Sequence, residues 1–332
     1  MAGSGRSCCK VRPGDHMNKI FSSTRSPASY LLPSACCRLP PSSFPRLLLS
    51  VSCFFILLFP NLGALAQRKS GSHPSIERET LSNEDREDID RAIGVVCSQR
   101  QLDSRGSVPI DVMQKRPSLS LRAPDVISGA ERAQRLLANA KALAIASLRE
   151  LSRTYKLDRS RGHSLRMSRA VARIQAVSRV KPDIDARDNA SVYLKTPHTI
   201  TFGTIFLAGL PSDEGMISVL AHELTHIGDG NSDTLRPLFQ AVGERASSLT
   251  GMSIHEQRAE ELTCDLIGAL AVQSFITAAP NYDSLPRRLA RSVEHNCVDE
   301  DDSDEEHLSP RNTLRAVLTL DRTLRRELVL GR

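Results

Sequence analysis

The sequence lacks an excess of charge over most of its length. The 332 residues carry a net charge of +6, but residues 1–66 hold seven Lys and Arg residues against one acid, Asp15. Removing these from the totals of 44 basic and 38 acidic residues leaves 37 of each sign in the remainder. Because binding to nucleic acid needs a basic surface, this balance argues against a nucleic-acid partner.

Cys-x-x-Cys spacing is also absent, which argues against a zinc site built from thiolates. Five of the eight cysteines lie in the first 66 residues, so Cys97, Cys264 and Cys297 remain in the rest of the chain. An oxidising compartment would allow these three residues one disulfide. We expect Cys97 to pair with Cys297, because Cys264 falls on a helix, expected over 253–276, that we predict to be packed next to the segment His222–His226.

The N-terminal 66 residues resemble an export signal. Arg46 precedes an apolar run, residues 47–59, and Ala64-Leu65-Ala66 forms an A-x-A cleavage site. The run is shorter than the ~20 residues needed to span a bilayer, and Pro60 interrupts it. We therefore predict a signal peptide cleaved after Ala66 and an exported, periplasmic or extracellular protein. An uncleaved N-terminal membrane anchor is the alternative, and Met17 is an alternative start.

Apolar residues at helical spacing predict a mostly helical chain. The expected helices cover 83–99, 129–155, 168–178, 212–230, 235–249, 253–276 and 311–328. Segments 191–194 and 199–207 are rich in Thr, Ile, Val and Phe, and predict two strands of a small sheet. The expected fold class is α+β, mostly helical. Residues 67–127 would form an N-terminal helix and linker, and residues 128–332 the main domain.

One motif carries recognisable chemistry, the sequence His222-Glu223-Leu224-Thr225-His226. Residues four apart on a helix project from one face, so both imidazoles can reach one metal ion with Glu223 beside it. Zinc is the expected ion, because two nitrogens and a carboxylate would leave a fourth position for water. Glu223 could then take a proton from that water as it attacks a peptide carbonyl.

The third metal ligand must come from elsewhere in the chain. A pattern with Gly three and His six residues after His226 is excluded, because Asp229 and Ser232 stand there. The helix expected over 253–276 offers Glu256, Glu260 and Glu261. Only Glu261 shares an apolar face with Asp265, and burying two unpaired carboxylates would be costly. Zinc for Glu261 and a histidine N–H for Asp265 would supply both partners. The alternative is an ordinary acidic helix edge.

The segment AHELTHIGDG, followed by the five residues 261–265, ELTCD, resembles the HtpX-like and CAAX prenyl protease-type zinc metallopeptidases, which combine H-E-x-x-H with a later E-x-x-x-D. The resemblance covers about residues 130–320 and is specific only in these two motifs. It implies a zincin-like, gluzincin fold with an H-E-x-x-H active-site helix, Glu261 as third zinc ligand and Asp265 as its support. No spanning helix is expected after residue 66, so the chain resembles a soluble, exported branch.

Two positions depart from the pattern of this family. The family often has Ala where Cys264 stands, a small change. Near its end the family tends to have a His-Pro-Pro segment followed by Arg, whereas this chain has His307-Leu308-Ser309-Pro310, and Thr313 at the place of the Arg. The resemblance therefore assigns no role to His307.

We expect a zinc-dependent endopeptidase with one zinc per chain. The resemblance implies unfolded or damaged proteins outside the cytoplasm as its polypeptide substrates, and the strand expected over 199–207 would present an edge to them. Two other hypotheses stay open. One is a catalytically silent, zinc-stabilised binding or chaperone-like module. The other is a helical, exported interaction protein without a metal.

Overall fold

The computed structural model describes residues 80–102, 116–193, 195–209, 212–230, 233–278, 288 and 304–330. The expected signal peptide, its cleavage site after Ala66 and the alternative start at Met17 lie outside these ranges. Cys297 lies outside them as well.

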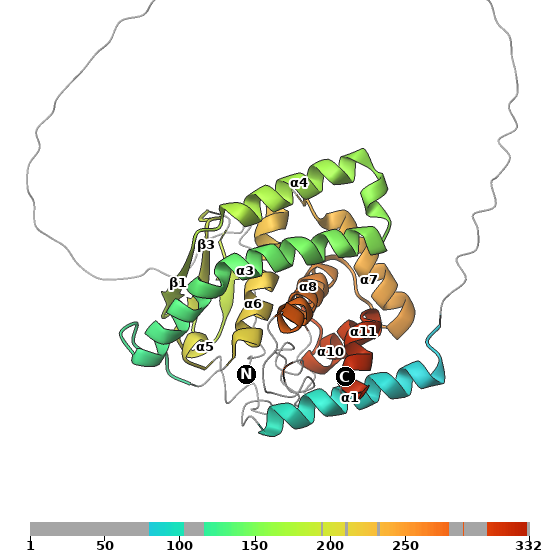
Figure 1. Ribbon diagram of the computed structural model, residues 1–332, viewed down its shortest axis with the longest axis horizontal. Helices are drawn as coiled ribbons and strands as arrows, with labels where there is room; N and C mark the ends of the chain where they lie inside the picture. The colour runs from blue at the N-terminus through green and yellow to red at the C-terminus, as the bar shows by residue number, and fades with distance from the viewer. Residues whose placement is uncertain are drawn as a thin grey trace, which may run out of the picture. The chain divides into compact units, whose positions relative to one another are not determined.

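A small sheet of three strands forms beside the helices (Figure 1). The strands are β1 (Arg179–Asp183), β2 (Ala190–Val192) and β3 (Thr199–Gly203), in the order β1-β3-β2. β1 runs parallel to β3, with Arg179 opposite Thr199, and β2 runs antiparallel to it. Strand β1 was not expected from the sequence, because RVKPD has three charged residues and no apolar run.

The expectation for residues 199–207 is wrong in two respects. The strand ends at Gly203, and residues Thr204–Gly209 form the short helix α5. Strand β3 also lies at the centre of the three-stranded sheet, where all five of its residues are buried, so it offers no edge to a substrate. A short apolar run such as 205–207 does not distinguish a strand from a buried helix. Strand β2 is the edge strand next to β3.

Helices make up most of the described chain, which confirms the mostly helical class with a small sheet. The longer helices are α1 (Asn83–Leu102), α3 (Pro124–Thr154), α4 (Arg161–Ala176), α6 (Asp213–Asp229), α7 (Arg236–Thr250), α8 (Glu256–Ala278), α10 (Pro310–Leu320) and α11 (Arg322–Leu330). A single 3-10 turn, η1 (Leu157–Arg159), joins α3 to α4.

Three helix predictions need correction. Helix α3 begins at Pro124, five residues earlier than expected. Helix α4 begins seven residues earlier than expected, because the Oγ atom of Ser160 accepts a hydrogen bond from the backbone N–H of His163 and caps the helix there. The helix expected over 311–328 is two helices, α10 and α11, which meet at Asp321. The carboxylate of Asp321 accepts hydrogen bonds from the backbone N–H groups of Thr323 and Leu324, so it starts a new helix.

Helix α6 lies in the centre of the fold, where it packs against α8, α3, α4 and strand β2 (Figure 1). Fifteen of its residues are buried.

Among the described residues, α8 alone is long and apolar enough to cross a membrane, but 61% of its most apolar window is buried inside the protein. A core helix can have the same length and composition, so the finding is weak evidence for a membrane span.

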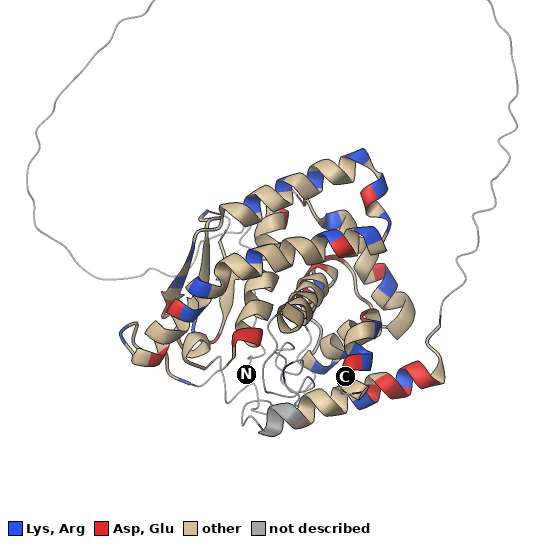
Figure 2. Cartoon of the chain, in the orientation of Figure 1, with Lys and Arg blue, Asp and Glu red and all other residues tan. Residues whose placement is uncertain are grey.

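Helix α1 packs against α10 and α11 through the buried residues Ile89, Ala92, Ile93 and Val96. Its acidic residues face basic residues of the two C-terminal helices (Figure 2). Asp85 forms an ion pair with the buried Arg325, and Asp90 lies 2.8 Å from Arg315. Cys97 is disulfide-bonded, and its expected partner, Cys297, falls outside the described residues.

Candidate metal centre

The motif lies in the second half of α6, in a helix that begins and ends as the sequence predicts. The Oγ atom of Ser212 accepts a hydrogen bond from the backbone N–H of Gly215, 3.1 Å away, and caps the N-terminus. Gly230 ends the helix at φ 60°, a value that favours glycine. The cap and the stop hold the motif in a regular helix, so that its two histidines lie one turn apart.

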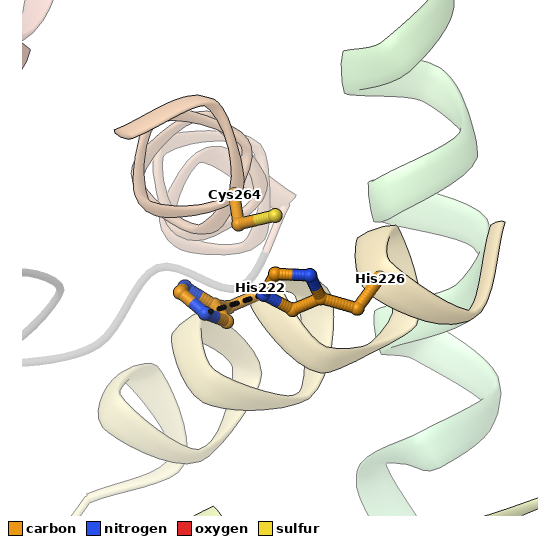
Figure 3. Close-up of side chains that lie close together, drawn as sticks. All are labelled: His222, His226 and Cys264. Atoms are coloured by element: carbon orange, nitrogen blue, oxygen red, sulfur yellow. Dashed lines mark hydrogen bonds between the residues drawn. The ribbon is translucent and has the colours of Figure 1, made fainter. Parts of the chain in front are cut away.

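The side chains of His222 and His226 converge on a common point (Figure 3). Their Nε2 atoms are 3.2 Å apart, and the rings lie with their centroids 5.0 Å from each other. Both residues are buried, with exposed fractions of 8% and 1%. Two buried imidazole nitrogens this close need a shared proton or a shared ion between them.

The carboxylate of Glu261, on α8, completes a triangle with these nitrogens. Its Oε2 atom lies 3.4 Å from Nε2 of His222 and 3.5 Å from Nε2 of His226. Ligand atoms about 2.0–2.2 Å from a tetrahedral zinc ion lie about 3.3–3.5 Å from one another. The triangle therefore has the size of one face of a zinc tetrahedron.

Two further observations make Glu261 a suitable donor. Its Oε2 atom is buried and accepts no hydrogen bond from the described residues, so a buried acceptor points at the two nitrogens without a conventional partner. Burial raises the pKa of Glu261, but the nearby imidazoles of His226 and His222 outweigh it and lower the pKa to about 2. A metal ion held by Glu261 would require the ionised carboxylate.

Each histidine has a carboxylate on its other ring nitrogen. Oδ1 of Asp265 lies 2.8 Å from Nδ1 of His222, and Oε1 of Glu260 lies 2.9 Å from Nδ1 of His226. Because an ionised carboxylate can only accept, both pairs place the proton on Nδ1, so Nε2 carries the lone pair that a metal ligand needs. The arrangement fixes the tautomer and the orientation of both rings.

The sequence predicted a histidine partner for Asp265 and missed Glu260. Glu260 does not share the apolar face of Glu261 and Asp265, so the pattern of apolar residues gave no reason to select it. A signal was nevertheless present. His222 and His226 are four apart on α6, and the two acids that reach them, Asp265 and Glu260, are five apart on a helix that packs against α6.

A cysteine lies at the same point. Cys264 is fully buried on α8, and its Sγ atom belongs to a set of ligand atoms with His222 and His226 that all lie within 4.8 Å of one another (Figure 3). Burial raises the pKa of the Cys264 thiol to about 12. The buried group of His222, His226 and Cys264 could hold a metal ion.

The C-terminal part of the chain brings a third imidazole to the site. Nε2 of His307 lies 4.0 Å from Oε2 of Glu261, and its Nδ1 lies 3.1 Å from Oδ1 of Asp304. The side chain of His307 is 18% exposed, more than those of the other two histidines. The sequence left His307 without a role, because only the fold brings this segment to α8.

The general base expected from the motif, Glu223, lies on α6 next to His222 and is fully buried.

The close approach of α6 and α8 depends on Gly268. A Cβ atom at this position would come within 2.9 Å of the backbone oxygen of Ser218, one turn before His222. A larger residue would therefore push the helix with Glu261 away from the helix with the histidines.

Comparison of the chain with protein-family models, with curated proteins and with solved structures gives no match. An interpretation of this site therefore depends on the residues of the chain itself.

Proposed function

We propose that the protein is a zinc-dependent endopeptidase. His222, His226 and Glu261 would hold one zinc ion, and Glu223 would act as the catalytic base. The observation that carries this proposal is the triangle of two Nε2 atoms and one Oε2 atom, with sides of 3.2, 3.4 and 3.5 Å. A buried set of two nitrogens and one carboxylate oxygen suits zinc and leaves a fourth position. The fold would then be of the zincin type, in its gluzincin form.

Zinc in such a site lowers the pKa of a water molecule toward neutrality and polarises a carbonyl group. Glu223 would take the proton of the attacking water and then deliver it to the nitrogen of the leaving peptide. Asp265 and Glu260 would keep the two imidazoles aimed at the metal position throughout. His307 would donate a hydrogen bond from Nε2 to the carbonyl oxygen as negative charge develops on it, which requires a proton on both ring nitrogens because Nδ1 already faces the carboxylate of Asp304.

A polypeptide substrate would bind along an edge of the three-stranded sheet. Strand β1, at one edge, is partly exposed, whereas all three residues of β2, at the other edge, are buried. An extended peptide can pair with a sheet edge through main-chain hydrogen bonds, which requires no particular side chain. Such binding suits unfolded or damaged proteins outside the cytoplasm. Export by the signal peptide would bring the enzyme to them.

One observation favours a second function, a zinc-stabilised binding or chaperone-like module. Cys264 supplies a fourth protein atom beside the other three, and a structural zinc site is closed by four protein ligands. Glu223→Gln separates the two functions. An endopeptidase should keep its zinc and its fold but lose hydrolysis, whereas a module has no hydrolysis to lose.

The first test is the zinc content of the purified full chain and of Glu261→Ala. We expect about one zinc per chain, sharply reduced in the variant, and hydrolysis of an unfolded protein that a chelator stops. Glu256→Ala is the matched control, because Glu256 is an exposed acid on the same helix. A folded wild-type chain without zinc would overturn the proposal. A zinc-loaded chain that cleaves no polypeptide would favour the module.

A further inference from the structure

The proposed site contains more donor atoms than a hydrolytic zinc ion uses. His222, His226 and Glu261 are three, and an open site reserves the fourth position for water. Cys264 nevertheless points its Sγ atom at the histidine pair from α8 (Figure 3). It stands three residues after Glu261, so both side chains project from the same side of the helix toward α6.

The distance from Cys264 to the histidines is within reach of coordination. A zinc ion about 2.0–2.1 Å from nitrogen and about 2.3 Å from sulfur holds these two atoms about 3.5 Å apart. The ligand atoms of Cys264 and the two histidines lie within 4.8 Å of one another, so the sulfur is at most about 1.3 Å farther from either ligand nitrogen than one zinc ion would hold it. Cys264 is fully buried, and the Oε2 atom of Glu261 beside it is a buried acceptor without a hydrogen bond from the described residues.

His307 is the other candidate for the fourth position. Its Nε2 atom lies 4.0 Å from Oε2 of Glu261, and its Nδ1 atom interacts with Asp304. His307 is 18% exposed, whereas Cys264 is fully buried. Sulfur is also the softer donor, and zinc binds thiolate readily. The observations therefore favour Cys264.

We propose that Cys264 is a fourth, displaceable ligand of the metal, which closes the site in the resting protein. This inference depends on the proposed metal site. As the bond between sulfur and metal forms, the S–H bond of the thiol breaks and its proton passes to solvent, with no change of oxidation state. Entry of water and substrate then requires that the thiolate leave and take up a proton again. The resting protein would be latent by virtue of a residue inside its own site.

Cobalt substitution tests this proposal on the full chain. We expect wild-type protein to bind one Co²⁺ with a thiolate-to-cobalt charge-transfer band in the near ultraviolet. Cys264→Ala should bind Co²⁺ at the same stoichiometry without this band, and His307→Ala should keep it. We further expect Cys264→Ala to bind zinc at least tenfold more weakly and to hydrolyse an unfolded protein several-fold faster than wild type.

The outcomes separate this proposal from the proposed function. Bound cobalt without the charge-transfer band, or a band that persists in Cys264→Ala, would overturn the thiolate ligand and leave the endopeptidase in place. A folded chain that binds no metal would overturn both. If Cys264→Ala does not fold, X-ray absorption of the zinc-loaded wild type decides the question, because a sulfur neighbour at about 2.3 Å is expected and its absence would contradict the proposal.

Discussion

Oδ1 of Asp265 lies 2.8 Å from Nδ1 of His222, although 43 positions separate the two residues in the chain. This contact joins α8 to the histidine that opens the motif on α6. The corresponding contact of Glu260 with His226, at 2.9 Å, joins the two helices one turn away. The two carboxylates therefore orient both imidazoles from the same neighbouring helix, and the metal position lies between α6 and α8.

Removing the charge of Asp265 should weaken metal binding without removing a ligand. An amide at this position binds the Nδ1 proton less strongly and can present its own N–H instead, so His222 loses its fixed tautomer. We expect Asp265→Asn to lower zinc affinity about 10–100-fold, measured by competition with a chelator. Glu256→Gln, a change of the same kind at an exposed position of α8, should leave the affinity unchanged. Equal affinities in wild type and Asp265→Asn would contradict the role.

The parts of the site that lie on regular helices could be predicted from the sequence. The spacing of His222 and His226 follows from the helix repeat, and the apolar face of α8 selected Glu261 and Asp265. The structure places all four side chains together.

The remaining parts depend on tertiary packing, which a local pattern does not contain. Glu260 contacts His226 because of the way α8 lies against α6, and His307 reaches Glu261 from a segment 46 positions farther along the chain. Strand β1 is too polar to show a strand pattern, and it forms because β3 pairs with it. The central place of β3 likewise follows from pairing on both of its sides.

Gly268 should be sensitive to the addition of a single methyl group. The new Cβ atom would lie 2.9 Å from the backbone oxygen of Ser218, which cannot move without shifting α6. We expect Gly268→Ala to lower the free energy of unfolding by about 1–3 kcal/mol, measured by urea denaturation, and to weaken zinc binding as the helices separate. Gly251→Ala is a poor control because of its positive φ, so Gly94→Ala, where a Cβ atom meets nothing within 4 Å, serves instead. Equal free energies of unfolding in the two variants would contradict a tight contact between α6 and α8 at Gly268.

Asp321 should make the free energy of unfolding fall as pH rises, the opposite of the usual effect of an acidic residue. Burial raises its pKa above the ordinary value of 3.8, although the N–H groups of Leu324 and Thr323 act against this. The folded protein therefore keeps the Asp321 proton to a higher pH than the unfolded chain does. From about pH 4 upward, until the folded-state pKa is passed, this residue lowers the free energy of unfolding as pH rises.

Two substitutions at Asp321 test this prediction. Asp321→Asn keeps an oxygen to cap α11 and removes the buried charge, so we expect it to be at least as stable as wild type at pH 7, with the difference disappearing in acid. Asp321→Ala removes the cap and should lose about 1 kcal/mol at both pH values. Thermal unfolding at pH 4 and pH 7 measures both. An Asn variant as unstable as the Ala variant would contradict the account.

Substitution of Asp85 tests whether α1 is part of the folded domain or a removable segment such as a lid or propeptide. Its partner Arg325 is almost completely buried, and without Asp85 the guanidinium would be a buried charge without that ion pair. We expect Asp85→Ala to lower the free energy of unfolding by about 2–4 kcal/mol, whereas Asp88→Ala, at a surface pair on the same helix, should cost less than about 1 kcal/mol. If α1 were a lid or propeptide, Asp85→Ala would raise activity and leave the stability of the rest unchanged.

His307 should act on catalysis and not on metal binding, if the proposed function is correct. Its Nε2 atom lies 4.0 Å from Oε2 of Glu261, and its side chain is 18% exposed, whereas Cys264, which we propose as the fourth ligand, is fully buried. A donor at this distance can still reach a substrate oxygen beside the metal. We expect His307→Ala to lower kcat about 10²–10³-fold with little change in KM, because the lost hydrogen bond forms mainly in the transition state. The zinc content should stay at one per chain, whereas a fall in zinc content comparable to that of Glu261→Ala would make His307 a ligand.

A second variant, Asp304→Asn, leaves the imidazole in place but removes the carboxylate beside its Nδ1, and it should give a smaller loss of kcat than His307→Ala. Unchanged kcat in His307→Ala would exclude the hydrogen bond to the substrate.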